Sequence, residues 1–70
     1  MKVFILIQTH DIEVAYLRVF QSQQLAEKIF NQIAKEDGLL DQETYQELAG
    51  TLRVAGDDAN CLQLVARIAA

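Results

Sequence analysis

His10, Asp11 and Glu13 form the cluster in this sequence whose residue types could best support catalysis or metal binding. An imidazole beside carboxylates can act as a general base or as a metal ligand. The sequence holds a single histidine and no recognised spacing of further ligands, so it does not predict a common zinc site. Asp and His are also ordinary turn residues. We therefore interpret this cluster as a polar loop between two strands.

Cys61 is the one cysteine, which excludes an intrachain disulfide and leaves a thiol that could pair with His10 as a nucleophile. No nucleophile motif surrounds it, and Leu62 and Leu64 follow in apolar sequence, so we interpret Cys61 as a small buried hydrophobic residue. Ser22 is expected to cap a helix, and the three isolated glycines form no phosphate-binding loop. We expect a protein that is not an enzyme and that uses no cofactor or metal.

The whole chain has a net charge of −4, and its acidic residues are concentrated in the second half. Seven acidic side chains fall within 23 residues that hold Arg53 as their only counter-charge: Glu36, Asp37, Asp41, Glu43, Glu47, Asp57 and Asp58. The six basic residues are scattered, so the sequence does not predict direct nucleic-acid binding. The acidic segment could form a surface that meets a basic partner protein, or simply a solvated face that keeps a small protein soluble.

The first half of the chain predicts two strands followed by a helix. Strands are expected over Lys2–Gln8 and Glu13–Phe20, where Val14, Tyr16, Arg18 and Phe20 alternate with other residues at the period of a strand. A helix is expected over Gln23–Glu36, with Gly38 after its end. Its apolar face has helical spacing and consists of Ala26, Ile29, Phe30 and Ile33.

Both faces of the first predicted strand are apolar, with Val3, Ile5 and Ile7 on one side and Phe4 and Leu6 on the other. A strand with one wet face would alternate apolar with polar residues. We therefore expect this strand to be central in its sheet and its second face to be covered by a partner chain.

The second half of the sequence is ambiguous. Asp41 is a good cap for a short second helix over Gln42–Ala49. Residues 51–55 and 61–68 fit a hairpin around the turn-rich segment 56–60, and they fit equally the spacing of helices over 42–55 and 58–69. The β-branched residues favour the hairpin. The expected fold is α+β, a small antiparallel sheet packed on one main helix plus a short second helix, with a ββααα arrangement as the alternative.

Length and composition predict a single domain over residues 1–70, near the lower limit for folding on one core. Because disulfides and metals are not expected to staple it, we expect a homodimer. The apolar run Val3–Ile7 is too short for a signal peptide, and no stretch approaches the length of a membrane span. These features predict a cytoplasmic protein that does not bind membranes.

The stretch Val19–Ile29, VFQSQQLAEKI, resembles a pattern found in short phage and mobile-element accessory proteins. These proteins have an N-terminal hairpin, a V-F-x-S strand end and a helix containing A-E, matched here by Val19–Ser22 and Ala26-Glu27. The resemblance covers about the first half of the chain and implies a hairpin–helix unit. Some small acidic phage proteins inhibit host defence, including anti-CRISPR proteins. The acidic segment is not part of the pattern, so the resemblance assigns no site residues.

These observations favour a non-enzymatic acidic binding protein, an inhibitor of the anti-defence type that occludes a basic groove of a partner. One alternative is a dimeric protein that sequesters a nucleotide or metabolite. An anionic ligand would then require arginine donors in a pocket, for which the candidates are Arg18, Arg53 and Arg67. The other alternative is a structural dimerisation module whose partner is a second copy.

Overall fold

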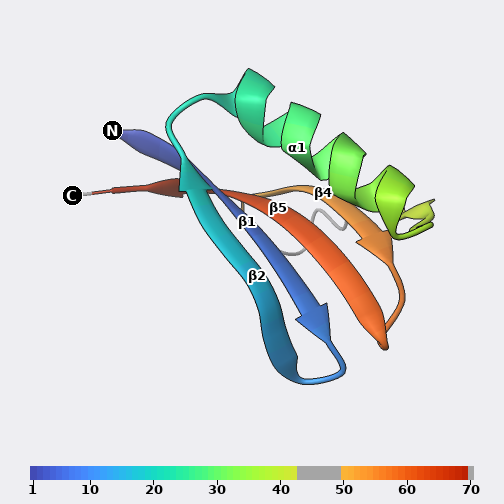
Figure 1. Ribbon diagram of the computed structural model, residues 1–70. Helices are drawn as coiled ribbons and strands as arrows, with labels where there is room; N and C mark the ends of the chain where they lie inside the picture. Colours follow the sequence, from blue (N-terminus) through green and yellow to red (C-terminus); the bar gives the residue numbers. More distant parts are fainter. Residues whose placement is uncertain (43–49, 70) are drawn as a thin grey trace.

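A single helix packs against one face of an antiparallel sheet in the computed structural model, which describes residues 1–42 and 50–69 (Figure 1). The sheet order is β2-β1-β5-β4-β3, and β3 is a two-residue strand at the edge. The elements are β1 (Lys2–His10), β2 (Glu13–Phe20), α1 (Gln23–Glu36), β3 (Asp41–Gln42), β4 (Thr51–Gly56) and β5 (Asn60–Ile68).

Both ends of α1 form as the sequence predicts. Ser22 is the N-cap, and its hydroxyl accepts a hydrogen bond from the Leu25 amide at 3.2 Å. At the other end Gly38 adopts a φ of 66°, the left-handed conformation that glycine tolerates best. The Leu39 amide then donates to the Ala34 carbonyl at 2.8 Å, which satisfies a carbonyl of the last turn in a Schellman motif. These caps fix where the chain leaves the helix.

β1 is central in the sheet, as predicted. It pairs with β2 on one side and along its full length with β5 on the other, from Lys2 opposite Ile68 to His10 opposite Asn60. Because successive side chains of a strand point to opposite faces, Phe4, Leu6 and Gln8 face α1 while Val3, Ile5 and Ile7 face away from it.

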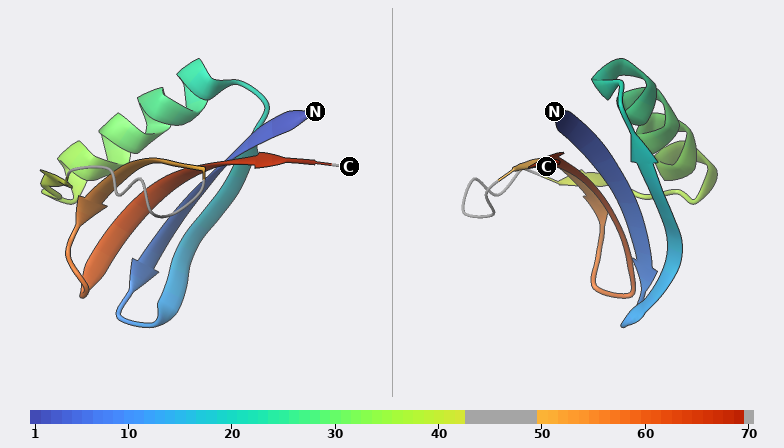
Figure 2. Two further views of the ribbon diagram at one scale, coloured as in Figure 1. Left: turned by 180° about the vertical axis from the view of Figure 1, so that it is seen from behind. Right: turned by 90° about the vertical axis from the view of Figure 1, so that its left-hand side faces the viewer.

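The core lies between α1 and the sheet. Phe30 and Ala26 of the helix are fully buried, and Ile29 and Ile33 pack at the margin, so the predicted apolar helix face is confirmed. The sheet contributes Leu6, Leu62, Leu64, Ala55, Phe4, Phe20 and Ala66. No other described element covers the opposite face of the sheet (Figure 2).

The C-terminal hairpin is confirmed, and the alternative with helices over 42–55 and 58–69 is wrong. Residues 51–56 and 60–68 are paired strands, with Leu62, Leu64 and Ala66 at the two-residue period on the buried face. The predicted start of the second helix is also wrong. Asp41 and Gln42 do not begin a helix but form strand β3, in which they pair with Ala55 and Val54. Residues 43–49 of that prediction lie outside the described residues, which contain no helix besides α1.

One face assignment in β2 is also wrong. The sequence places Val14 on the same face as Tyr16, Arg18 and Phe20, but the register shifts so that Gln8 pairs with Tyr16 and Thr9 with Val14. Ala15 is the extra residue of this bulge, and it turns Val14 to the opposite face. β1 is also longer than predicted, which shortens the first loop to Asp11 and Ile12.

α1, the helix that the described part of the chain contains, has neither the length nor the apolar composition to cross a bilayer.

We predict that Leu64→Ala destabilises the protein far more than Ile68→Ala, a matched truncation in the same strand. Leu64 is fully buried and Ile68 is 86% exposed. Truncating a buried leucine to alanine lowers the free energy of unfolding by about 2–5 kcal/mol. Truncating an exposed side chain changes it by at most about 0.5 kcal/mol. Urea unfolding followed by circular dichroism measures both; equal losses would contradict the described core.

Candidate functional site

The sheet topology gathers acidic residues at the end of the molecule where the hairpins turn. The β1–β2 turn carries Asp11, the β4–β5 turn carries Asp57 and Asp58, and Asp37 follows the last residue of α1. The Asp11 amide donates to the Ala59 carbonyl at 2.9 Å, so the two turns are in direct contact. Figure 1 shows both turns at the end of the sheet opposite the chain termini. We call Asp11, Asp37, Asp57 and Asp58 the acidic end.

A pocket of about 680 Å³ opens at this end. Its lining residues include the acidic Asp37, Asp41 and Asp57 and the apolar Leu39 and Leu40. Leu40 is 80% exposed. Apolar side chains beside acidic residues suit a lysine or arginine. Its aliphatic stem can pack on the apolar side chains while its positive charge binds a carboxylate.

Buried Gln8 holds two walls of the pocket together. Its side-chain amide nitrogen donates to Asp37 Oδ2 at 2.7 Å and to Asn60 Oδ1 at 2.9 Å. Gln8 is only 6% exposed, so losing these partly buried hydrogen bonds leaves a buried amide without partners, which is costly. The end of α1 and the start of β5 are thereby fixed to the centre of the sheet.

Asp57 shapes the β4–β5 turn as well as charging it. Its Oδ1 accepts hydrogen bonds from the Ala59 and Asn60 amides at 2.9 and 3.1 Å. Gly56 precedes it at a φ of 96°, and a side chain there would collide with the Asn60 carbonyl. The Gly56 amide donates to the Leu40 carbonyl at 2.8 Å and closes the pocket on the β3 side.

Asp41 differs from the other acidic residues because it is paired. One guanidinium nitrogen of Arg53 lies 3.0 and 3.1 Å from its two carboxylate oxygens. Arg53 also donates to Asn31 at 2.6 Å and stacks 4.3 Å above the Phe30 ring centre. Arg53 therefore links β4 to β3 and α1 and neutralises Asp41.

The residues of the acidic end differ from Asp41 in this respect. Asp11, Asp37, Asp57 and Asp58 are exposed, and within the described residues none of them forms an ion pair. Lys2 and Arg67 lie at the other end of β1 and β5. Within the described residues these two cations therefore lie away from the acidic end, and such a separation of charges orients an approaching charged partner.

The predicted acidic surface is only partly brought together. Asp37, Asp41, Asp57 and Asp58 lie near the pocket, Glu36 lies in the last turn of α1, and Glu43 and Glu47 lie outside the described residues. Asp11 was missed. Asp11 could have been included from the expected topology. Two hairpins whose first strands run in the same direction place their turns at the same end of the sheet.

The three candidate arginines do not meet in one chain. Arg18 stacks 4.8 Å from the Phe20 ring on β2, whereas Arg53 lies on β4, with β1 and β5 between them. Arg67 pairs with Val3, so its side chain extends from the face of the sheet opposite α1. Its guanidinium donates a hydrogen bond to the Ala66 carbonyl at 3.0 Å. Within one chain these donors do not line a common pocket for an anion.

His10 and Cys61 are not arranged as a catalytic pair. His10 pairs with Asn60 and Thr9 pairs with Cys61, so the imidazole and the thiol leave opposite faces of the sheet. Cys61 is half-buried, and its sulfur accepts a hydrogen bond from Gln63 at 3.7 Å. In the described residues no group of three or more His, Cys, Asp or Glu side chains could hold a metal ion.

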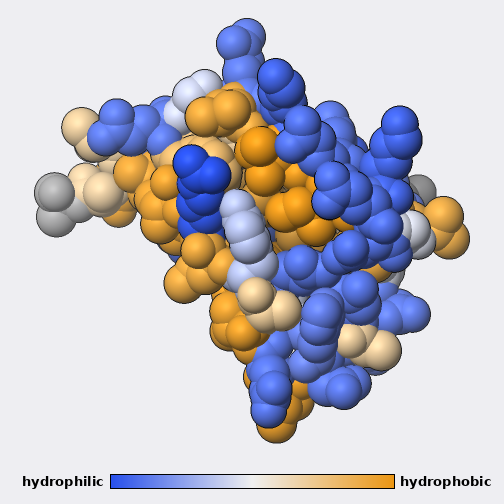
Figure 3. Space-filling view, in the orientation of Figure 1, coloured by the Kyte–Doolittle hydropathy of each residue, from blue (hydrophilic) through white to orange (hydrophobic). Residues whose placement is uncertain are grey.

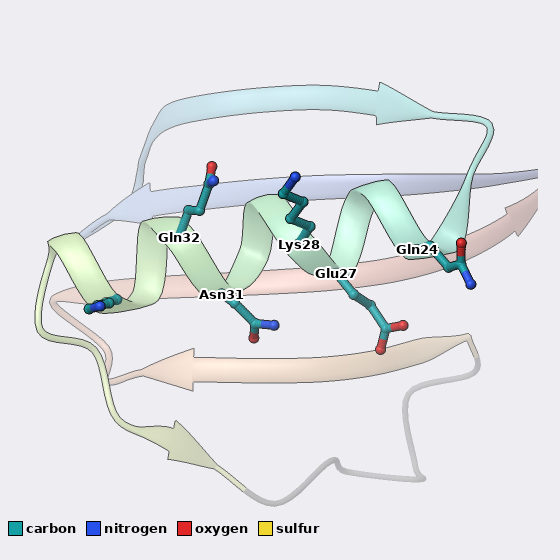
Figure 4. A pocket seen from close by; sticks show the side chains of 6 residues that line it. Gln24, Glu27, Lys28, Asn31 and Gln32 are labelled. Atoms are coloured by element: carbon teal, nitrogen blue, oxygen red, sulfur yellow. The ribbon is translucent and has the colours of Figure 1, made fainter.

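A second hollow, of about 470 Å³, runs along the outer surface of α1 (Figure 4). Glu27 and Asn31 point toward β4, while Lys28 and Gln32 point to the other side of the helix. Two lysines and one glutamate give the hollow a charge of only +1, and no apolar side chain lines it. Its chemistry singles out no ligand class, so the pocket at the acidic end is the stronger candidate site.

We predict that Gln8→Glu lowers the free energy of unfolding by about 1–3 kcal/mol at neutral pH, because it replaces a buried donor with a carboxylate facing Asp37. Gln32→Glu adds the same charge on exposed helix surface and should change stability by at most about 0.5 kcal/mol. Urea unfolding of both variants measures the difference, and an unchanged Gln8→Glu midpoint would show that the Gln8 hydrogen bonds contribute nothing.

Comparison of this chain with models of known families, with curated proteins and with solved structures finds no match. The geometry of the acidic end therefore has to carry the functional argument.

Proposed function

We propose that this protein is a non-enzymatic binding protein whose acidic end occupies a basic groove of a partner protein. The observation that supports this most is the convergence of Asp11, Asp37, Asp57 and Asp58 from three separate segments onto one end, unpaired within the described residues. Carboxylates held at fixed positions can replace phosphates as the ligands of lysine and arginine side chains.

The pocket provides a specific mode of contact. A basic side chain of the partner enters it with its stem against Leu39 and Leu40 and its cation near Asp37 and Asp57. Gln8 and the Asp57 turn hold these two carboxylates in place before binding, so little side-chain entropy is lost on association. The remaining acidic residues raise the association rate and orient the partner.

The partner class follows from charge and from the resemblance of Val19–Ile29 to phage accessory proteins. A nuclease of bacterial defence has a basic groove that normally holds nucleic acid, and a rigid acidic protein can compete for it. We propose this anti-defence inhibition, including inhibition of CRISPR nucleases, as the biological role.

The test is inhibition of DNA cleavage by a panel of purified defence nucleases, RNA-guided enzymes among them. Asp58→Lys reverses a charge at the acidic end without touching a described hydrogen bond, and Glu27→Lys makes the same change on α1. We predict that the protein inhibits at least one nuclease and that Asp58→Lys weakens inhibition by about tenfold or more, equivalent to about 1.4 kcal/mol.

Glu27→Lys should inhibit within about twofold of the parent, because its charge change lies outside the acidic end. Equal inhibition by the two variants would contradict the role of the acidic end. Absence of inhibition across the panel would contradict the anti-defence role.

A further inference from the structure

The face of the sheet opposite α1 is apolar across three neighbouring strands. The register places Ile5 between Val19 and Val65, and Ile7 beside Leu17. Side chains paired across strands share a face, so these residues form one surface. We call it the open face and define it by Val3, Ile5, Ile7, Leu17, Val19 and Val65.

The open face is exposed in a single chain. Leu17 and Val19 are 59% and 57% exposed, and Val3, Ile5, Ile7 and Val65 are partly exposed. Figure 3, which is seen from the α1 side, shows the largely hydrophilic outer surface of the helix that lies on the other side of the sheet. A continuous apolar surface of this kind on a small protein marks an interaction site.

We propose that a second copy of this chain packs on the open face, so that two sheets stack face to face with α1 of each protomer on the outside. This inference is independent of the proposed function at the acidic end.

The size of the face fits this occupant. The chain measures 32 × 24 × 22 Å, so the broad side that contains the open face covers at most roughly 700 Å², of the same order as the roughly 800 Å² that each partner contributes to a standard interface. Stacked sheets lie about 10 Å apart, which two layers of Val, Ile and Leu side chains fill. A chain of 70 residues also gains most from such burial, because a small domain buries a low fraction of its own surface.

Charge favours a second copy in one orientation. The six residues of the open face are uncharged, and Arg67, which shares their side of the sheet beside Val3, is positive. Two copies with a net charge of −4 can therefore meet there without placing carboxylates in contact. A two-fold axis perpendicular to the strands puts the acidic end of one protomer beside the end of the other that carries Lys2 and Arg67. A basic partner protein, by contrast, meets no carboxylate among the six residues of the open face.

The test is the mass of the protein by sedimentation equilibrium from about 5 to about 500 µM, over which a reversible dimer changes its population. We expect the wild-type mass to rise to that of a dimer. Leu17→Lys places a charge in the open face and should raise the dissociation constant by about tenfold or more. Leu25→Lys is the control, because Leu25 is 45% exposed but lies on α1, which stays on the outside of the proposed dimer.

Val65→Lys separates face-to-face packing from pairing through the β2 edge. Val65 lies on β5, and β1 separates it from β2. A lysine at this position therefore blocks face-to-face stacking but leaves pairing through the β2 edge possible. We expect Val65→Lys to be monomeric. A wild-type monomer at every concentration, a Val65→Lys dimer, or a stability loss in Leu17→Lys that does not depend on concentration would each overturn the proposal. The wild-type measurement decides even if a variant fails to fold.

Discussion

One helix can cover only one face of a sheet, and the rest of this structure follows from that constraint. α1 buries Phe30 and Ala26 against β1 and β5, which places the main hydrophobic cluster on one side of the sheet, while buried Val54 of β4 lies on the other. β1 lies centrally with apolar side chains on both faces, so the hydrophobic residues that α1 cannot reach remain on the other side. We propose that a second copy of the chain buries them, with residues such as Leu17 and Val65 forming the contact surface.

The antiparallel order of the strands determines where the charge goes. Hairpin turns of β1–β2 and β4–β5 fall at the end where α1 also terminates, so three short acidic segments meet there. Gln8 converts this meeting into a fixed geometry by bonding Asp37 and Asn60 from the centre of the sheet. The acidic end and the open face lie on different parts of the molecule, and a dimer built on the open face would present two acidic ends.

Much of the fold could be predicted from local signals. Ser22, the apolar face around Phe30 and the glycine at position 38 define α1 because each acts within a few residues. The C-terminal hairpin was harder, since Leu62, Leu64 and Ala66 fit a strand while a shifted set fits a helix, and only pairing with β1 separates the two. The Val14 face was mispredicted because the bulge depends on a partner strand. The acidic residues were visible in the sequence, but the pairing of Asp41 with Arg53 and the addition of Asp11 depend on topology.

The proposed function depends on the ability of the acidic end to bind cations in its pocket. Titration of the ¹⁵N-labelled protein with a hexa-arginine peptide, followed by NMR, tests this most directly. We predict saturable shifts of the Gly38, Leu39, Gly56 and Asn60 amides that weaken with salt. Shifts spread evenly over the surface, or centred on α1 near Glu27, would show that the acidic end is only a solvated surface and would contradict the account.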